Sequence, residues 1–201
     1  MSTIHKKLSP QDLASLPLWQ YAGKIILIRD GKEAERAVEL LLGEECLGFD
    51  TETRPTFQRG QYHDPALVQV ALEDVVYLFQ LVPCGGLQPL LPLFTAAVPA
   101  KICLGVEEDL RRLRTVKKFT GRGFVELLDC VRPLGILDGG LRKLCANLLG
   151  VRISKREQTS NWARQDLTER QLRYAATDAW VSRKIFLVAR ELRARGTVAS
   201  D

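Results

Sequence analysis

The chain has 201 residues and a formal net charge of +5, with 46% hydrophobic and 26% charged residues. This length predicts one domain, and this balance is typical of a soluble globular protein and excludes a disordered or collagen-like chain. The basic excess permits a polyanionic partner without requiring one.

The predicted elements begin after residues 10–22, which we expect to be irregular or a short helix. Asp30 is an N-cap candidate for a helix through residue 42, which Gly43 ends, and Thr168 with Gln171 fits the capping box of a long final helix. The apolar runs predict strands over residues 24–29, 46–51, 67–72, 75–81, 101–104 and 124–128. Further helices are predicted over about 107–116, 141–149 and 168–195. This order indicates an α/β architecture with a central mixed sheet, in which 67–72 and 75–81 form an antiparallel hairpin.

One uncharged stretch, residues 75–100, is long enough to span a bilayer. Its many prolines and glycines would leave backbone groups unpaired in lipid, so we expect a buried strand, a turn and a short helix, and no membrane partner. The first twenty residues hold no continuous apolar run, and we expect no secretory signal. The five cysteines form no CxxC pair, which favours buried free thiols and a cytoplasmic location.

Acidic side chains in unusual positions carry the functional argument. Asp50 and Glu52 leave an apolar strand two residues apart, so they point to the same face. Tyr174 and Asp178 stand four apart on the final helix and share one face beside small alanines. Asp109 falls in the first turn of a helix. Each feature alone has an ordinary alternative: a solvated strand end, a tyrosine at the rim of the core, or a favourable charge at a helix N-terminus.

Taken together, the four acids predict a site for divalent cations. Oxygen ligands are what Mg²⁺ and Mn²⁺ prefer. A pair of such ions can activate a water and stabilise the leaving oxygen in phosphodiester cleavage. Zinc is a weak competitor, because the chain has two histidines and no Cys/His ligand spacing.

Three segments resemble a known family. GFDTET over residues 48–53, Asp109 after GVEE, and YAATD over residues 174–178 resemble the exonuclease motifs of DnaQ-like 3'–5' exonucleases. The Tyr-x-x-x-Asp spacing is similar to that of the tyrosine-bearing (DEDDy) subgroup, which contains ribonuclease D and the Werner exonuclease domain. Residues 141–180 resemble this subgroup almost continuously, and residues 48–72 are most similar to small bacterial single-domain members.

The resemblance implies a ribonuclease-H-like fold with a five-stranded mixed sheet between helices. It implies an N-terminal extension over residues 1–23, an exonuclease domain over 24–195 and a C-terminal tail over 196–201. The implied activity is removal of nucleoside 5'-monophosphates from the 3' end of single-stranded DNA or RNA, with two divalent ions, Mg²⁺ or Mn²⁺, as cofactors.

The resemblance also implies a role for each acid. Asp50 would bridge two metal ions, and Glu52 and Asp178 would complete the first site. Asp109 would hold the second ion, directly or through water, and Tyr174 would orient the attacking water.

Contacts to nucleic acid are expected near these motifs. Thr53 and Arg54 stand where family members often carry an aromatic residue, and the segment 54–62 mixes cations with aromatics. Lys155 matches a family lysine that could meet a phosphate, or it is a solvated surface lysine. Trp162 matches a family position that we expect mainly to pack, with base stacking as the alternative. Two basic clusters either track phosphates or form solvated faces: Arg111, Arg112, Arg114, Lys117, Lys118 and Arg122; and Arg152, Lys155 and Arg156.

Two other functions fit the same sequence. The chain could be a catalytically silent nucleic-acid-binding module, which the presence of all four acids and the tyrosine disfavours. It could also be an oligoribonuclease-type enzyme acting on very short substrates. The sequence leaves the choice between DNA and RNA, the oligomeric state, the pathway and any protein partner open.

Overall fold

A computed structural model describes residues 4–56 and 60–198 of the chain. The strands are β1 (Lys24–Ile28), β2 (Cys46–Thr53), β3 (Pro65–Ala71), β4 (Val75–Gln80), β5 (Ala100–Cys103) and β6 (Phe124–Glu126). The α-helices are α1 (Pro10–Ser15), α2 (Gly31–Leu41), α3 (Leu91–Thr95), α4 (Val106–Val116), α5 (Leu127–Val131), α6 (Leu141–Leu149) and α7 (Glu169–Ala194). Two 3-10 turns, η1 (Gln88–Leu90) and η2 (Arg132–Leu134), precede α3 and follow α5.

The strands of the described residues form one sheet in the order β1-β4-β3-β2-β5-β6. Only β3 runs antiparallel to its neighbours, β2 and β4, and every other pairing is parallel. The predicted mixed α/β architecture and the β3–β4 hairpin are therefore confirmed. The five strands that the resemblance implies are one too few: β6, which the apolar run 124–128 predicted, is a sixth strand at the edge of the sheet, beside β5.

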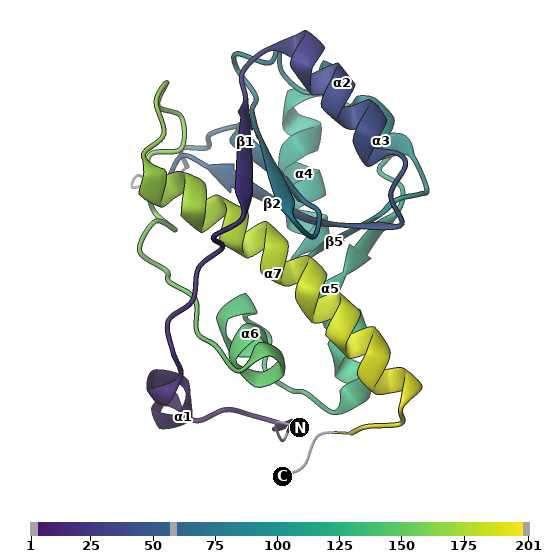
Figure 1. The fold of residues 1–201 in the computed structure, drawn as a ribbon. Coiled ribbons are helices and arrows are strands. Elements are labelled where there is room, and N and C mark those ends of the chain that lie inside the picture. The colour runs from purple at the N-terminus through teal and green to yellow at the C-terminus, as the bar shows by residue number, and fades with distance from the viewer. Residues whose placement is uncertain (1–3, 57–59, 199–201) are drawn as a thin grey trace.

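Helices cover both faces of the sheet (Figure 1). On one face, α2, α3 and α4 bury apolar side chains such as Leu41, Phe94 and Leu113 against Phe49 of β2. On the other face, the long helix α7 crosses the sheet and packs its alanines against the remaining apolar side chains of β3 and β4. A third cluster fills the space between α7, α5 and α6. Alternate residues of each strand thus enter different cores, as the period of a strand requires.

The helix boundaries follow their capping residues closely. Asp30 accepts hydrogen bonds from the backbone of Lys32 and Glu33 and starts α2. Thr168 and Gln171 form the predicted capping box of α7. Gly150, in the left-handed region at φ 68°, ends α6. These predictions are confirmed.

One boundary was predicted wrongly. The expected strand over 124–128 ends at Glu126, and a helix begins at Leu127. The Glu126 side chain accepts a hydrogen bond from the backbone N–H of Leu128, 3.2 Å away, and so caps α5. An apolar run alone does not distinguish a strand from a short buried helix, so the pattern over these residues was ambiguous.

The uncharged stretch 75–100 folds as predicted, into β4, a turn, η1 and α3. Within the described residues, no helix combines the length and apolar character that a bilayer span requires. All five cysteines are free and four of them are buried, which confirms the prediction of unpaired thiols. The cytoplasmic location and the domain boundaries at residues 24 and 195 stay predictions.

The segment before β1 packs against the rest of the chain. Ile4 and Leu8 are buried, and the backbone N–H of His5 donates to Asn147 at 2.9 Å. The backbone of Arg152 accepts a hydrogen bond from Trp19 and donates one to Pro17, which forms a parallel bridge between Leu18 and Arg152. Residues 4–23 are therefore part of the packed structure, although they precede the sheet.

Candidate active site

Three of the predicted acids meet where β2 and α7 cross. Asp50 and Glu52 lie on the face of β2 that α7 covers, and Asp178 reaches them from α7. One carboxylate oxygen from each of the three residues lies within 4.8 Å of the other two. Glu52 and Asp178 are buried, with exposed fractions of 9% and 8%. The structure thus brings together side chains that stand far apart in the sequence.

A close approach of helix to strand makes this meeting possible. Gly48 lies on the same face of β2, and a Cβ atom added to it would stand 1.9 Å from the carbonyl oxygen of Ala179. Ala175 and Ala176 are also fully buried against the sheet. Small side chains at this crossing let α7 lie directly on β2, and Asp178 is carried to the carboxylates as a result.

Asp109 approaches the same region from the first turn of α4. Glu126 accepts hydrogen bonds from the backbone N–H groups of Gly105 and Val106, at 2.8 and 3.0 Å, and holds the start of the helix. The hydroxyl of Thr51 then donates to the Asp109 carboxylate at 2.7 Å. Asp109 lies outside the three-acid group, but its charge raises the pKa of Asp50.

Burial raises the pKa of every acid in the site, and repulsion by the other site acids raises those of Asp50 and Glu52 further. For Asp50, burial is the main cause, followed by the charges of Asp109 and Asp178. Burial and then the charge of Asp50 raise the pKa of Glu52 well above its usual range. Burial raises the pKa of Asp178 to about 7 and that of Asp109 to about 6, although the hydrogen bond from Thr51 lowers the latter. Without a counter-charge, the site therefore resists holding four carboxylates in their ionised form.

The donor atoms fit an oxygen-seeking divalent cation. Asp109 Oδ2 and Asp178 Oδ1 are buried and have no hydrogen-bond partner among the described residues. Buried carboxylate oxygens without a partner are costly unless a cation binds them. The three clustered acids offer oxygen atoms only, which suits Mg²⁺ or Mn²⁺ better than zinc.

Tyr174 lies one helical turn before Asp178, and its side chain is partly buried. Burial and then the charge of Asp178 raise the pKa of its hydroxyl, so the phenol keeps its proton at neutral pH. Its ring packs on the indole of Trp162, with the ring centroids 5.9 Å apart. Trp162 is fully buried, so it presents no face for a base to stack on. Its position fits the expected packing role and not the base-stacking alternative.

The other predicted nucleic-acid contacts do not share one pocket. Thr53 follows a bulge at the end of β2 and is partly exposed. Arg54 is exposed and lines a pocket of about 600 Å³ that also includes Pro65. Lys155 is exposed and lines a different pocket, which it shares with Tyr174. Part of the predicted contact segment 54–62, residues 57–59, lies outside the described residues.

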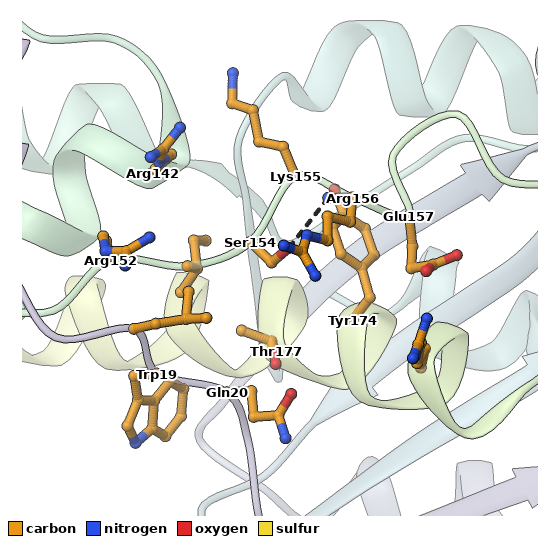
Figure 2. A pocket seen from close by; sticks show the side chains of 13 residues that line it. Trp19, Gln20, Arg142, Arg152, Ser154, Lys155, Arg156, Glu157, Tyr174 and Thr177 are labelled. Atoms are coloured by element: carbon orange, nitrogen blue, oxygen red, sulfur yellow. Dashed lines mark hydrogen bonds between the residues drawn. The ribbon is translucent and has the colours of Figure 1, made fainter. Parts of the chain in front are cut away.

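The two basic clusters behave differently. On α4, Arg111 and Arg112 both pair with Glu108, at 2.8 and 2.7 Å, so these two cations share one carboxylate within their own helix. Arg152, Lys155 and Arg156 instead line the pocket beside Tyr174 (Figure 2). The paired arginines of the first cluster fit the interpretation of a solvated helix face. The second cluster still fits the interpretation of a groove that binds phosphates.

Two residues of the site were not singled out from the sequence. Thr51 positions Asp109 through its hydroxyl. Gln69 lies directly opposite Asp50 in the β2–β3 register, and it is fully buried with neither amide atom bonded to a described residue. A glutamine inside the apolar run LVQVA was the available signal, because polar residues are rarely fully buried without a role.

Known proteins are similar to the chain in sequence and in structure. A family model described as 3'-5' exonuclease matches residues 25–190. A 3'-5' exonuclease of Arabidopsis thaliana is 27% identical over 95% of this chain and 73% of its own length. Ribonuclease D of Xanthomonas oryzae is 31% identical over 75% of this chain but only 40% of its own length. The EXO domain of Aedes aegypti Nibbler superposes with a TM-score of 0.80 at 19% identity, over 90% of this chain and 95% of that domain.

Proposed function

The chain belongs to the 3'-5' exonuclease family, in its DnaQ-like branch, and from this premise we propose that it removes nucleoside 5'-monophosphates from the 3' end of single-stranded DNA or RNA. The observation that carries the proposal is the convergence of Asp50, Glu52 and Asp178, whose oxygens lie within 4.8 Å of one another. We assign the chain to the tyrosine-bearing subgroup because Tyr174 stands one turn before Asp178.

The four acids would hold two divalent cations, Mg²⁺ or Mn²⁺. Asp50 would contact both, Glu52 and Asp178 would complete one site, and Asp109 would serve the other directly or through water. When bound, such cations stabilise developing charge in phosphodiester hydrolysis and activate water at neutral pH. The buried oxygens of Asp109 and Asp178 that have no partner among the described residues support this assignment.

Tyr174 would orient the attacking water from the side of Asp178. Its raised pKa keeps the hydroxyl protonated, so it acts as a hydrogen-bond donor and not as the base. Packing against buried Trp162 fixes the direction of the ring. We therefore expect Tyr174→Phe to lower kcat by about 10²–10⁴-fold if the hydroxyl takes part in proton handling.

The test uses matched single-stranded DNA and RNA carrying a 5' label, incubated with Mg²⁺ or Mn²⁺. We expect stepwise shortening from the 3' end, release of 5'-monophosphates, and full inhibition by EDTA. Asp50→Asn should abolish the reaction, whereas Asp129→Asn, which changes an exposed acid on α5, should retain it. Wild-type turnover in Asp50→Asn contradicts the proposal.

The same assay separates the two alternatives. Binding of nucleic acid without turnover under any metal and substrate would identify a silent module. A length series from the dinucleotide upward would identify an oligoribonuclease-type enzyme if activity falls steeply as the substrate lengthens. Comparing DNA with RNA of the same sequence reports the preference, because the two differ at the 2'-hydroxyl.

A further inference from the structure

A cationic pocket lies beside the candidate active site. Its volume is about 570 Å³, and it is formed by residues 18–20, residues 152–157, α6 and α7 (Figure 2). Of the described residues that line it, Glu157 is the one acid. The cations that line it are Arg142, Arg152, Lys155, Arg156 and Arg170.

None of these five cations makes an ion pair with a described residue. By contrast, two other arginines of α7 are paired: Arg173 pairs with Glu169 at 2.8 Å, and Arg190 pairs with Glu45 at 2.6 Å. The Nε atom of Arg142 is buried and has no hydrogen-bond partner among the described residues. Like charges gathered in a concave site repel one another, and a bound polyanion removes that cost.

The pocket is continuous with the carboxylate site. A second depression, of about 620 Å³, shares the side chains of Arg142, Lys155 and Tyr174 with the cationic pocket and extends to Asp178. Tyr174 therefore stands at the junction of the two. Along the axis of α7, Arg170 lies about 12 Å from Asp178, at about 1.5 Å per residue. That length corresponds to about three or four stacked nucleotides, at about 3.4 Å each.

The segment that precedes β1 builds one wall. The backbone N–H of Trp19 donates to the carbonyl of Arg152 at 2.9 Å, and the backbone N–H of Arg152 donates to the carbonyl of Pro17 at 2.9 Å. The Nε atom of Arg152 also donates to the carbonyl of Leu16, at 2.9 Å. The Trp19 ring packs against Trp180, with centroids 5.0 Å apart. The wall is thus held by backbone hydrogen bonds and an aromatic contact, and the pocket is formed before any ligand arrives.

We propose that this pocket binds phosphates of the substrate strand several nucleotides upstream of its 3' end, while the terminal phosphodiester lies at the carboxylates. The inference rests on the proposed function, because the carboxylate site sets where the 3' end lies. A free nucleotide or inorganic phosphate has the same anionic chemistry, so the test distinguishes these ligands from the strand.

The experiment measures binding without turnover. Fluorescence anisotropy in EDTA compares 5'-labelled oligothymidylates of two, four, six and ten nucleotides at several salt concentrations. The variant is Arg156→Ala/Arg170→Ala, whose side chains are exposed and form no hydrogen bond with a described residue. The control is Lys32→Ala/Arg36→Ala, which removes the same charge from two exposed residues of α2, on the opposite face of the sheet.

We expect the pocket variant to lose roughly tenfold more affinity for the ten-nucleotide strand than for the dinucleotide. Its slope of log affinity against log salt should become less steep by about 1.4, or about 0.7 for each lost phosphate contact. The control should behave as the wild type at every length.

Two results would overturn the inference: equal losses at all lengths, or an unchanged affinity and salt slope. In the wild type, displacement of the long strand by thymidine 5'-monophosphate or inorganic phosphate at the same concentration as by an unlabelled ten-nucleotide strand would also overturn it, because a free phosphate would then occupy the pocket as well as the strand does. Failure of the wild type to hydrolyse any strand in Mg²⁺ would instead count against the proposed function, since binding in EDTA is read independently of turnover.

Discussion

In the absence of divalent cations, the protein should become less stable as the pH rises from 5 to 8. The perturbation is removal of metal with EDTA, which leaves the acids of the site without a counter-charge. Folding raises the pKa of Asp178 from 3.8 to about 7 and that of Asp109 from 3.8 to about 6. In this range the folded protein holds more protons than the unfolded chain, so the free energy of unfolding falls with increasing pH.

The magnitude follows from the two pKa shifts. At about 1.36 kcal/mol per unit, Asp178 costs roughly 4 kcal/mol and Asp109 roughly 3 kcal/mol once ionised. Both groups are fully protonated in both states well below pH 4, so the cost is absent there; it grows as the carboxyls of the unfolded chain ionise and is complete once those of the folded protein have lost their protons. Because the acids interact, the two costs do not add. Part of the Asp178 cost falls below pH 5, so roughly 3 kcal/mol is lost between pH 5 and pH 8, which lowers the midpoint of thermal unfolding by about 6–12 °C for a chain of this size.

Circular dichroism melts in EDTA at half-unit pH steps measure the effect. The range stops at pH 8, because burial lowers the pKa of Lys101 to about 8 and its loss of a proton stabilises the fold above that value. Asp178→Asn should flatten the dependence of the unfolding midpoint on pH. Mg²⁺ at 1,000 times its Kd should raise the free energy of unfolding by about 4 kcal/mol. The reasoning is refuted if the midpoint stays constant or rises with pH in EDTA, or if Asp178→Asn keeps the wild-type slope.

Two further variants test how the site is built. Thr51→Val removes the hydroxyl that donates to Asp109, and we expect kcat/KM to fall about ten- to hundredfold, since a hydrogen bond to a charged group is worth about 1.5–3 kcal/mol. Thr51→Ser should retain most activity, and equal losses in both variants would show that the hydroxyl is not the cause. Gly48→Ala places a Cβ 1.9 Å from the Ala179 carbonyl oxygen, so we expect a loss of about 3 kcal/mol or more in chemical denaturation. Gly139→Ala, whose added Cβ meets its nearest neighbour at 3.6 Å, is the matched control, and equal stability of the two variants would contradict the close crossing of α7 on β2.

Local sequence signals were sufficient to predict most of the helices and strands. The N-cap at Asp30, the capping box at Thr168 and the glycine after α6 act within a few residues, so their effect can be read without knowledge of the fold. The β3–β4 hairpin is also local, because its strands are neighbours in the chain. The boundary at Glu126 was predicted wrongly although its cap is local, because the apolar run 124–128 fits a strand as well as a short buried helix.

The sequence by itself was also enough to predict which side chains would carry the chemistry. Asp50, Glu52, Asp109, Tyr174 and Asp178 were identified from residue type, spacing and family resemblance, since these properties belong to the chain before it folds. Spacing within one strand or one helix places two of these groups on a common face.

Only the tertiary structure decided how these groups meet. The absence of a side chain at Gly48 sets the depth at which α7 lies on β2, and the hydroxyl of Thr51 joins the strand to Asp109 on α4. The cationic pocket likewise depends on the docking of residues 18–20 beside Arg152. Each of these contacts joins segments distant in sequence, and no local pattern records such a pairing, because it arises from the packing of complete elements against one another.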